Sequence, residues 1–401
     1  MPTLNPEILT WARETAGLSL DEAGRAIGLK DAYGRSSAER LAELEAGNEE
    51  PSRSLVVRMS KTYRRSLLVF YLDAPPATGD RGQDFRTVPG AEPPSYSPVL
   101  DALIRDIRGR QSIIRSLLED METEALPFIG SAVMSVPTSE LAHRIVQQTN
   151  FNLQEFRNQE NVDPAFSYLR SRVEDAGIFV LLLGNLGSHH TNISVDTFRG
   201  FAVADDTAPL VVINDQDARV AWSFTVLHEI VHLWLGTTGI SGARAENNIE
   251  RYCNEVAGEI LLPAEENREL SRVRVGSFDQ LVNSIESAAR VRRISRAMVG
   301  YRLYQLGVIN QRTWKELADH FRKEWLASKD LDASEQGRSE GGPNYYVVKR
   351  HRLGKALLGL ATRSLSEGLL TYTKAGQLLG VRPVNVDPLL FGETQPRRDR
   401  A

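Results

Sequence analysis

The chain has 401 residues, of which 41% are hydrophobic and 25% are charged, and its net charge is -4. This composition predicts a soluble protein of two or three domains and excludes a fibrous or disordered chain. No apolar run reaches the roughly 18 residues of a membrane helix, and the N-terminus does not have the pattern of a signal peptide. We therefore expect no membrane association and a cytoplasmic location. The single cysteine, Cys253, excludes an internal disulfide and a cysteine-cluster metal site, so a metal would be held by histidines and carboxylates.

Residues 5–75 are predicted to form five short helices. Gly17 ends the first helix, and Ser19 with Glu22 forms a capping box at the start of the second. The segments LSLDEA, RLAELEAGNEEPS and YRRSLLVFYL together resemble the repressor-type (XRE) helix-turn-helix of many phage and toxin-antitoxin regulators. The resemblance implies DNA binding through the second motif helix.

The position of that helix suggests which side chains would contact DNA. We expect three in the groove and three near phosphates, namely Ser36, Ser37 and Arg40, and Lys30, Arg35 and Arg53. The turn at residues 30–35 is several residues longer than the tight turn of the motif. Alternatively, the bundle keeps the fold and serves only in dimerisation or in holding a protein partner.

Residues 76–97 are rich in Pro, Gly and Asp and are predicted to be a linker. A helix over 98–121 follows, which packs either on the next domain or on a second copy of the chain. From residue 139, two helices precede the apolar run 178–183 and two strand-like runs, FRGFAVAD and APLVVIND. These elements predict an α+β fold with a small sheet.

The sequence His228-Glu229-Ile230-Val231-His232 follows the last strand and lies in a nearly uninterrupted apolar run. Residues four apart share one face of a helix, so His228 and His232 would present two imidazoles to one cation, with Glu229 beside them. A catalytic zinc site takes three protein ligands and leaves a position for water. This motif therefore predicts two zinc ligands and a general base.

The third ligand should come from the next helix, where the candidates are Glu246, Glu250, Glu255 and Glu259. Glu250 shares a stripe with Cys253, Asn254 and Ala257, and the small Ala257 and Gly258 allow close approach of the two helices. This periodicity favours Glu250 and predicts that Glu255 and Glu259 face solvent. Cys253 is predicted to be a small buried side chain rather than a fourth ligand.

A second resemblance covers about 90 residues of this region. The pattern of a strand, then F-T-x-x-H-E-x-x-H, then E-x-x-x-N-x-x-A and L-L-x-P resembles the ImmA/IrrE metallopeptidases, and it is met by Phe224, Thr225, His228, Glu229, His232, Glu250, Asn254, Ala257, Leu261, Leu262 and Pro263. The resemblance implies a zincin-like fold with Glu250 as third ligand and Glu229 as general base. It also implies pairing with a repressor-type domain.

Three further side chains are candidate donors to the transition state, namely His189, His190 and Tyr252. Arg199 could hold a substrate carboxylate, but we expect it to pair with an acidic neighbour. Zn²⁺ is the expected metal, although two histidines and one carboxylate also accept Mn²⁺ or Fe²⁺.

The rest of the chain is predicted to be helical, with Ser295 capping one helix, and residues 344–401 are basic. The segment TKAGQLLGVRPVNV weakly resembles half of another helix-turn-helix, so this region is either a second DNA contact or a helical cap. The expected divisions are a helix-turn-helix domain (1–75), a linker (76–97), a connecting helix (98–138), a zincin-like metallopeptidase domain (139–265), a helical cap (266–326), a flexible linker (327–343) and a basic helical C-terminal region (344–401).

Two functions fit these features. The first is an intracellular zinc endopeptidase that cleaves a regulatory protein such as a repressor or an antitoxin, coupled to a DNA-binding-like module. The second is a DNA-binding transcriptional regulator or antitoxin, in which the zinc domain senses a signal or holds a toxin without turnover. A homodimer is compatible with both.

Overall fold

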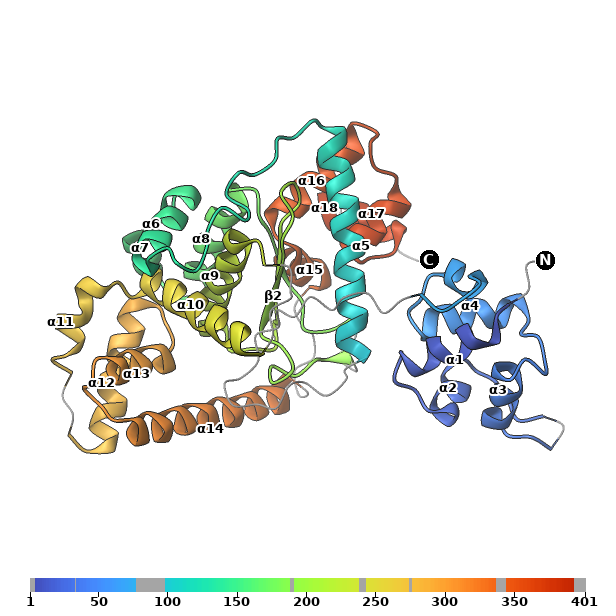
Figure 1. The fold of residues 1–401 in the computed structure, drawn as a ribbon, viewed down its shortest axis with the longest axis horizontal. Coiled ribbons are helices and arrows are strands. Elements are labelled where there is room, and N and C mark those ends of the chain that lie inside the picture. The colour runs from blue at the N-terminus through green and yellow to red at the C-terminus, as the bar shows by residue number, and fades with distance from the viewer. Residues whose placement is uncertain are drawn as a thin grey trace, which may run out of the picture.

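The computed structural model describes residues 4–32, 34–76, 98–187, 191–237, 243–273, 276–336 and 344–392, with the backbone alone for 243–247 and 330–336. The protein is mostly helical and contains one three-stranded mixed sheet (Figure 1). The predicted α+β class is confirmed. No helix among the described residues is both long enough and apolar enough to cross a membrane.

The N-terminal residues form a small helical bundle with a core of its own. Its elements are α1 (Pro6–Glu14), α2 (Leu20–Ala26), α3 (Ser37–Glu45), α4 (Arg53–Thr62) and the 3-10 helix η1 (Leu67–Tyr71). Capping boxes at Ser19 and Ser36 fix the starts of α2 and α3. Leu9, Leu41 and Met59 are among the apolar side chains buried between the helices. The bundle thus buries its own apolar surface, independently of the sheet.

The sheet comprises β1 (Phe179–Leu182), β2 (Gly200–Val203) and β3 (Leu210–Ile213) in the order β1-β3-β2. Strand β1 is parallel to β3, and β2 is antiparallel to it. Every residue of β1 and β3 is buried, which is typical of a sheet covered on both faces.

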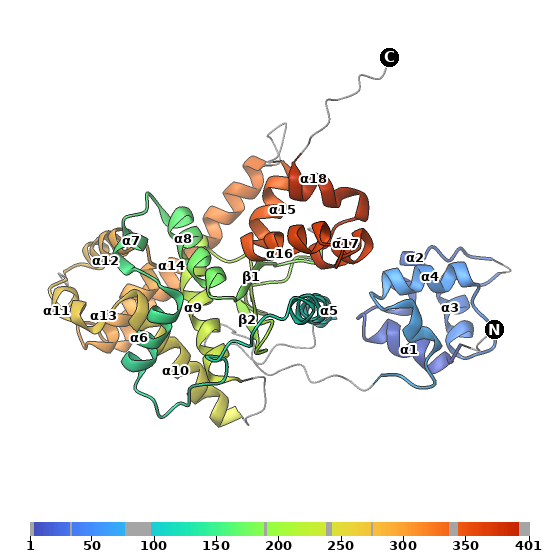
Figure 2. The same ribbon diagram turned by 90° about the horizontal axis from the view of Figure 1, so that it is seen from above.

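Successive strand side chains point to opposite faces and join two different cores. Val180 and Leu182 contribute to one core, and Phe179 and Leu181 to the other. The first core is built mainly from α6 (Thr138–Thr149), α7 (Leu153–Arg157), α8 (Val162–Asp175), α9 (Arg219–Leu235), α10 (Ala243–Leu261), α11 (Asn267–Leu270), α12 (Phe278–Arg292), α13 (Arg296–Gln305) and α14 (Gln311–Gln336), with the 3-10 helix η3 (Ala264–Glu266) between α10 and α11. The second is built from α5 (Pro98–Asp120), α15 (Tyr345–Leu353), α16 (Lys355–Ser366), α17 (Tyr372–Leu379) and α18 (Val386–Phe391), with the 3-10 helix η4 (Pro383–Asn385) before α18. Figure 2 shows the sheet between α8 and α9 on one side and α5 and α16 on the other.

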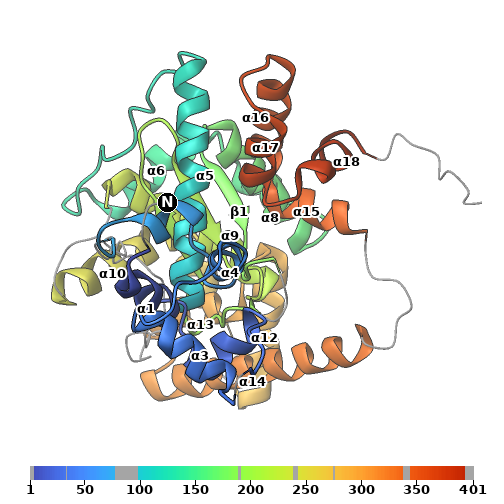
Figure 3. The ribbon, with the colours of Figure 1, turned by 90° about the vertical axis from the view of Figure 1, so that its right-hand side faces the viewer.

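The C-terminal helices are therefore part of the layer that covers the sheet. A buried ion pair on α8 attaches them: Glu174 accepts hydrogen bonds from the backbone N–H of Lys355 (2.9 Å), and Arg170 donates to the carbonyl of Arg352 (3.2 Å). A side chain at Gly354, whose φ is +80°, would collide with both partners. Figure 3 shows α5 beside α16 and α17, in agreement with the packing of α17 on α5.

Three of the segments predicted from the sequence can be compared with helices in the structure. Of the two alternatives for residues 98–121, α5 packs on the sheet of its own chain. Ser295 caps α13, as predicted, by accepting a hydrogen bond from the N–H of Met298 at 3.1 Å. Helix α14 extends to Gln336 and so continues into the segment 327–343 that we expected to be a flexible linker.

Candidate metal centre

Helix α9 carries the H-E-x-x-H sequence through the centre of the first core. Its residues from Thr225 to Trp234 are all buried, which explains why the sequence is apolar on every face. Gly236 ends the helix with φ +62°, and it lies so close to Gly130 that a Cβ at position 236 would be 2.8 Å from the Cα of Gly130. The helix is thereby fixed in position at the end nearest His232.

Three side chains bring their ligand atoms together, as the sequence predicted. The Nε2 atoms of His228 and His232 are 3.2 Å apart. The Glu250 carboxylate on α10 lies 3.2 Å from His228 Nε2 and 3.3 Å from His232 Nε2. A tetrahedral zinc ion with bonds of about 2.0 to 2.1 Å holds its ligands about 3.3 Å apart. Different oxygens of Glu250 make the two contacts, Oε2 with His228 and Oε1 with His232, and all three separations are of the size that a tetrahedral zinc site requires.

The burial of the three side chains differs. His228 and His232 are 0% and 1% exposed, whereas the side chain of Glu250 is 31% exposed. Among the three side chains, that of Glu250 is the one in contact with solvent. Catalytic zinc sites differ from structural ones in keeping one ligand position open to solvent.

A hydrogen bond to each histidine leaves its Nε2 available for the metal. His228 Nδ1 lies 3.1 Å from Asn254 Oδ1, and His232 Nδ1 lies 3.3 Å from Thr237 Oγ1. Because an amide oxygen can only accept, Nδ1 of His228 must carry the hydrogen, and its Nε2 keeps a free lone pair. Such partners orient metal-binding histidines in many proteins. Asn254 was part of the family pattern, whereas Thr237, directly after the helix-ending Gly236, was missed.

Glu229 is 1% exposed and faces the edge strand β2. A Cβ built on Gly200 would lie 2.8 Å from Glu229 Oε1 and 2.7 Å from the methyl group of Thr225. Only a residue without a side chain fits at this point of β2. Gly200 thus sets the space available to the carboxylate beside the ligands, which the sequence did not reveal.

The charge of Glu250 is also favourable for metal binding. Burial alone would disfavour its ionised form, but the interactions with the His228 and His232 imidazoles outweigh burial and hold the pKa of the Glu250 carboxyl well below its usual range. The third ligand is therefore an anion at neutral pH.

Two other carboxylates of α10, those of Glu255 and Glu259, lie away from the histidines in the described part of the helix. Glu255 is exposed and pairs with Arg251 at 3.9 Å, as expected for a solvent-facing residue. Glu259 is largely buried, contrary to our expectation, because its carboxylate accepts a hydrogen bond from the N–H of Ala264 at 2.9 Å. The side chain of Glu246 lies outside the described residues. Within the described part of the chain, the one metal-ligand cluster is that of His228, His232 and Glu250.

The remaining candidates near the site have structural roles or are not described. Tyr252 donates its hydroxyl to the carbonyl of Val136 at 2.8 Å, and its role as a donor to the transition state stays a prediction. Arg199 pairs with Asp217 at 3.7 Å, as expected. Cys253 is fully buried in the core. His189 and His190 lie outside the described residues.

In the N-terminal bundle, the candidate DNA contacts take part in local structure. Ser36 caps α3 and forms a side-chain hydrogen bond with Glu39. The backbone N–H of Ser37 donates a hydrogen bond to the Asp31 carboxylate at 2.7 Å. The Arg40 guanidinium donates to the carbonyl of Lys30 at 2.5 Å. Arg35 forms an exposed ion pair with Glu49 at 3.2 Å. Lys30 and Arg53 are exposed. These contacts leave the DNA-binding role a prediction.

A buried H-E-x-x-H helix and a third, carboxylate ligand from the adjacent helix define a site of the metallopeptidase class. Comparison with protein families agrees, because residues 183–304 match the model of the IrrE N-terminal-like domain, Peptidase_M78. The chain thus carries a Peptidase_M78 metallopeptidase domain with a candidate metal site. The match does not extend to the N-terminal bundle. Neither the curated proteins nor the solved structures gave a significant match.

Proposed function

We propose that the protein is a zinc-dependent endopeptidase that cleaves a regulatory protein, such as a repressor or an antitoxin. One observation carries the proposal: the two histidine Nε2 atoms lie 3.2 Å apart, and each lies 3.2 to 3.3 Å from a carboxylate oxygen of Glu250, which is the spacing of a tetrahedral zinc site. The neighbouring Glu229 on the same helix supplies the carboxylate that hydrolysis needs.

His228, His232 and Glu250 would hold the ion. When bound, zinc would act as a Lewis acid that lowers the pKa of water and polarises the substrate carbonyl. Glu229 accepts the proton of the attacking water and then donates it to the amine nitrogen that leaves when the peptide bond breaks. Asn254 and Thr237 keep both imidazoles in the orientation that ligation requires. Zinc is favoured over manganese and iron because it is the metal of this class of site, although the donor set accepts all three.

The N-terminal bundle supports a regulatory substrate rather than a nutritional one. It has a separate core, and its sequence resembles repressor-type DNA-binding domains. A peptidase that carries such a module would act where a DNA-bound regulator or its antitoxin partner is found. DNA is therefore the second partner in this proposal.

The test compares the wild type with Glu229→Gln, which removes the base and retains both histidines. Each zinc-loaded protein is incubated with the products of the neighbouring genes, and new protein N-termini are identified by terminal-amine labelling. We expect cleavage by the wild type alone, with equal zinc content in both proteins.

The opposite result points to the other function. If neither protein cleaves a partner, while both shift the promoter DNA of their own operon equally, the peptidase proposal fails. The chain would then act as a regulator or antitoxin whose metal domain senses a signal or holds a toxin.

A further inference from the structure

A pocket lies on the other side of the sheet from the metal-binding helix. It has a volume of about 640 Å³ and is bounded by α5, α15, α17 and the loop that joins α17 to η4. A volume in this range suits a small organic molecule. Two of the residues that line the pocket are charged, namely Arg382 of the loop and Asp106 of α5, and the others are neutral. The side chains at its wall therefore carry no net charge.

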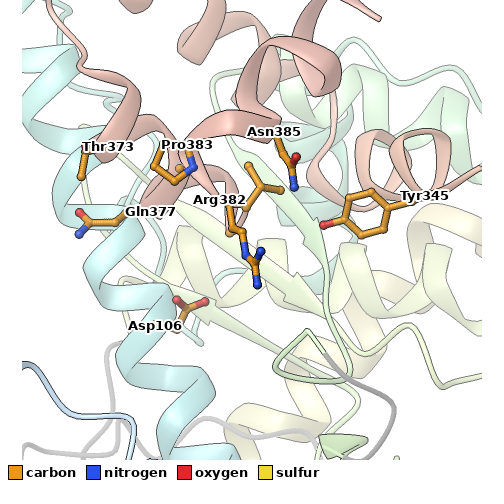
Figure 4. Close-up of a pocket in the computed structure, with 10 residues that line it drawn as sticks. Asp106, Tyr345, Thr373, Gln377, Arg382, Pro383 and Asn385 are labelled. Atoms are coloured by element: carbon orange, nitrogen blue, oxygen red, sulfur yellow. The ribbon is translucent and has the colours of Figure 1, made fainter. Parts of the chain in front are cut away.

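The two charged side chains share the pocket without pairing with each other. Asp106 forms its ion pair with Arg110, at 2.8 Å, and no carboxylate in the described part of the chain forms one with Arg382. Figure 4 shows the guanidinium of Arg382 extending into the pocket, with Asp106 on one side and Tyr345 of α15 on the other. A cation and an anion thus face the same space, and each can accept a partner of the opposite charge.

One buried residue, Arg110, positions both charges from behind the wall of the pocket. Arg110 is 6% exposed, and its Nη2 donates to the Asp106 carboxylate. A Cβ on Gly380, whose φ is +62°, would be 2.5 Å from the same Nη2. Because only a residue without a side chain fits there, the turn after α17 packs directly on Arg110. Arg382, two residues further along the chain, is thereby brought to the face of α5 that carries Asp106.

This pair of charges selects the class of ligand. A simple anion would be attracted by Arg382 but repelled by Asp106, and a simple cation would meet the reverse. A molecule that carries one charge of each sign satisfies both side chains. A guanidinium binds a carboxylate through charge-assisted hydrogen bonds, and a carboxylate accepts them from an ammonium group. An ammonium and a carboxylate on one small molecule are the charged groups of a free amino acid or of a short peptide.

The neutral part of the wall suits the rest of such a ligand. The amide groups of Gln377 and Asn385 line the pocket, and amides can both donate to and accept from a peptide group. The hydroxyl of Tyr346 donates to Asn385 Oδ1 at 3.4 Å, which orients this amide. The side chain of Tyr345 is 55% exposed and offers an aromatic ring to an apolar side chain.

We propose that the pocket between α5, α15 and α17 binds a small zwitterion, the chemistry that free amino acids share with short peptides whose ends are unblocked. Arg382 binds the carboxylate of the ligand, and Asp106 binds its ammonium group. The site does not rest on the proposed peptidase function, because the metal centre belongs to the first core, on the opposite face of the sheet.

The test screens the full-length, zinc-loaded protein by thermal shift against each of the twenty common amino acids and against dialanine and trialanine. The strongest ligand is then titrated by calorimetry, and its identity distinguishes an amino acid from a peptide. We expect saturable binding at one site per chain. The N-acetylated ligand, which lacks the ammonium group, and the ligand amide, which lacks the carboxylate, should each bind roughly ten- to a hundredfold more weakly. This is the usual effect of losing a charge-assisted hydrogen bond.

Two variants assign the two charges. Arg382→Ala, at an exposed position, should weaken binding of the unblocked ligand roughly ten- to a hundredfold and leave the weak binding of the amide unchanged. Asp106→Asn should do the same for the ammonium group, leaving binding of the N-acetylated ligand unchanged. The matched controls are Arg363→Ala on α16 and Glu119→Gln on α5, which remove the same charges from exposed positions outside the pocket. Both should bind as the wild type does.

Three results would overturn the proposal. The first is that the wild type binds none of the probes. The second is that Arg382→Ala binds the unblocked ligand as tightly as the wild type does, since the ligand would then reside elsewhere, for example at the zinc ion. The third is that the N-acetylated ligand and the amide bind as tightly as the unblocked one, because the pocket would then recognise neither charge.

Discussion

Gly200 and Glu229 are in such close contact that a single methyl group on the strand would meet the carboxylate of the helix at 2.8 Å. Glu229 has no room to move toward β2, and Thr225, one turn earlier, closes the same space at 2.7 Å. The position of the general base is thus determined by the edge strand as well as by its own helix.

Gly200→Ala should therefore reduce peptidase activity while leaving the metal bound. The added methyl must displace Glu229 by several tenths of an ångström, and a misplacement of about 1 Å can reduce catalysis roughly a hundredfold. We expect a loss of kcat of at least about tenfold, with zinc content unchanged by metal analysis. Gly258→Ala on α10 is the matched control, because a methyl there contacts nothing closer than 3.8 Å, and it should keep full activity.

Glu250→Ala should lower zinc occupancy sharply, because it removes one of three ligands. Glu255→Ala on the same helix removes an exposed carboxylate and should retain one zinc per chain. Both are measured by metal analysis after dialysis against a weak chelator. Full zinc in Glu250→Ala would transfer the third-ligand role to another carboxylate, and Glu246 would then be the first to test.

Asn254→Ala should weaken zinc binding about 10- to 100-fold, the effect typical of losing the partner that orients a metal-binding histidine. Thr237→Val should act in the same direction through His232, and Thr237→Ser should restore binding because it keeps the hydroxyl. The control is Asn248→Ala, an exposed asparagine of the same helix as Asn254. Competition with a chromogenic chelator gives the affinities, and equal affinities for Asn254→Ala and Asn248→Ala would contradict this role.

The ligands could be predicted from the sequence because their relationship is largely local. His228 and His232 share a helix face through a spacing of four residues, and the stripe of Glu250, Asn254 and Ala257 marks the side of α10 that meets α9. Gly200 and Thr237 could not be found in this way. Gly200 meets Glu229 only because β2 pairs with β3 in a definite register, and Thr237 reaches His232 only through the turn at Gly236.

In the C-terminal region, the sequence likewise did not reveal which charged side chains become buried. Its excess of Lys and Arg suggested a solvated or nucleic-acid surface, because charged side chains usually face water. In the structure, Lys349 and Arg352 of α15 turn toward α5 and Asp215, because the same helix also supplies Leu353 to the core on the sheet. Net charge identifies a basic segment but does not show which of its cations become buried.

The stability of the protein should change with pH through Lys349. Its pKa falls from 10.5 to about 8 on folding, so the folded state releases this proton more readily than the unfolded state does. Below pH 8 both states are protonated and the full cost of the buried ammonium is present, at most about 3 kcal/mol. Between pH 8 and 10.5 the unfolded state binds more protons, so this residue's contribution to stability rises with pH and its cost disappears. Lys349→Met should thus be more stable than the wild type at pH 7 and lose that advantage by pH 10.5, as measured by urea unfolding. Lys374→Met, at an exposed position on α17, should show no such pH dependence. An advantage of Lys349→Met that is equal at both pH values would come from its apolar side chain alone, and Lys349 would then not be a strained cation.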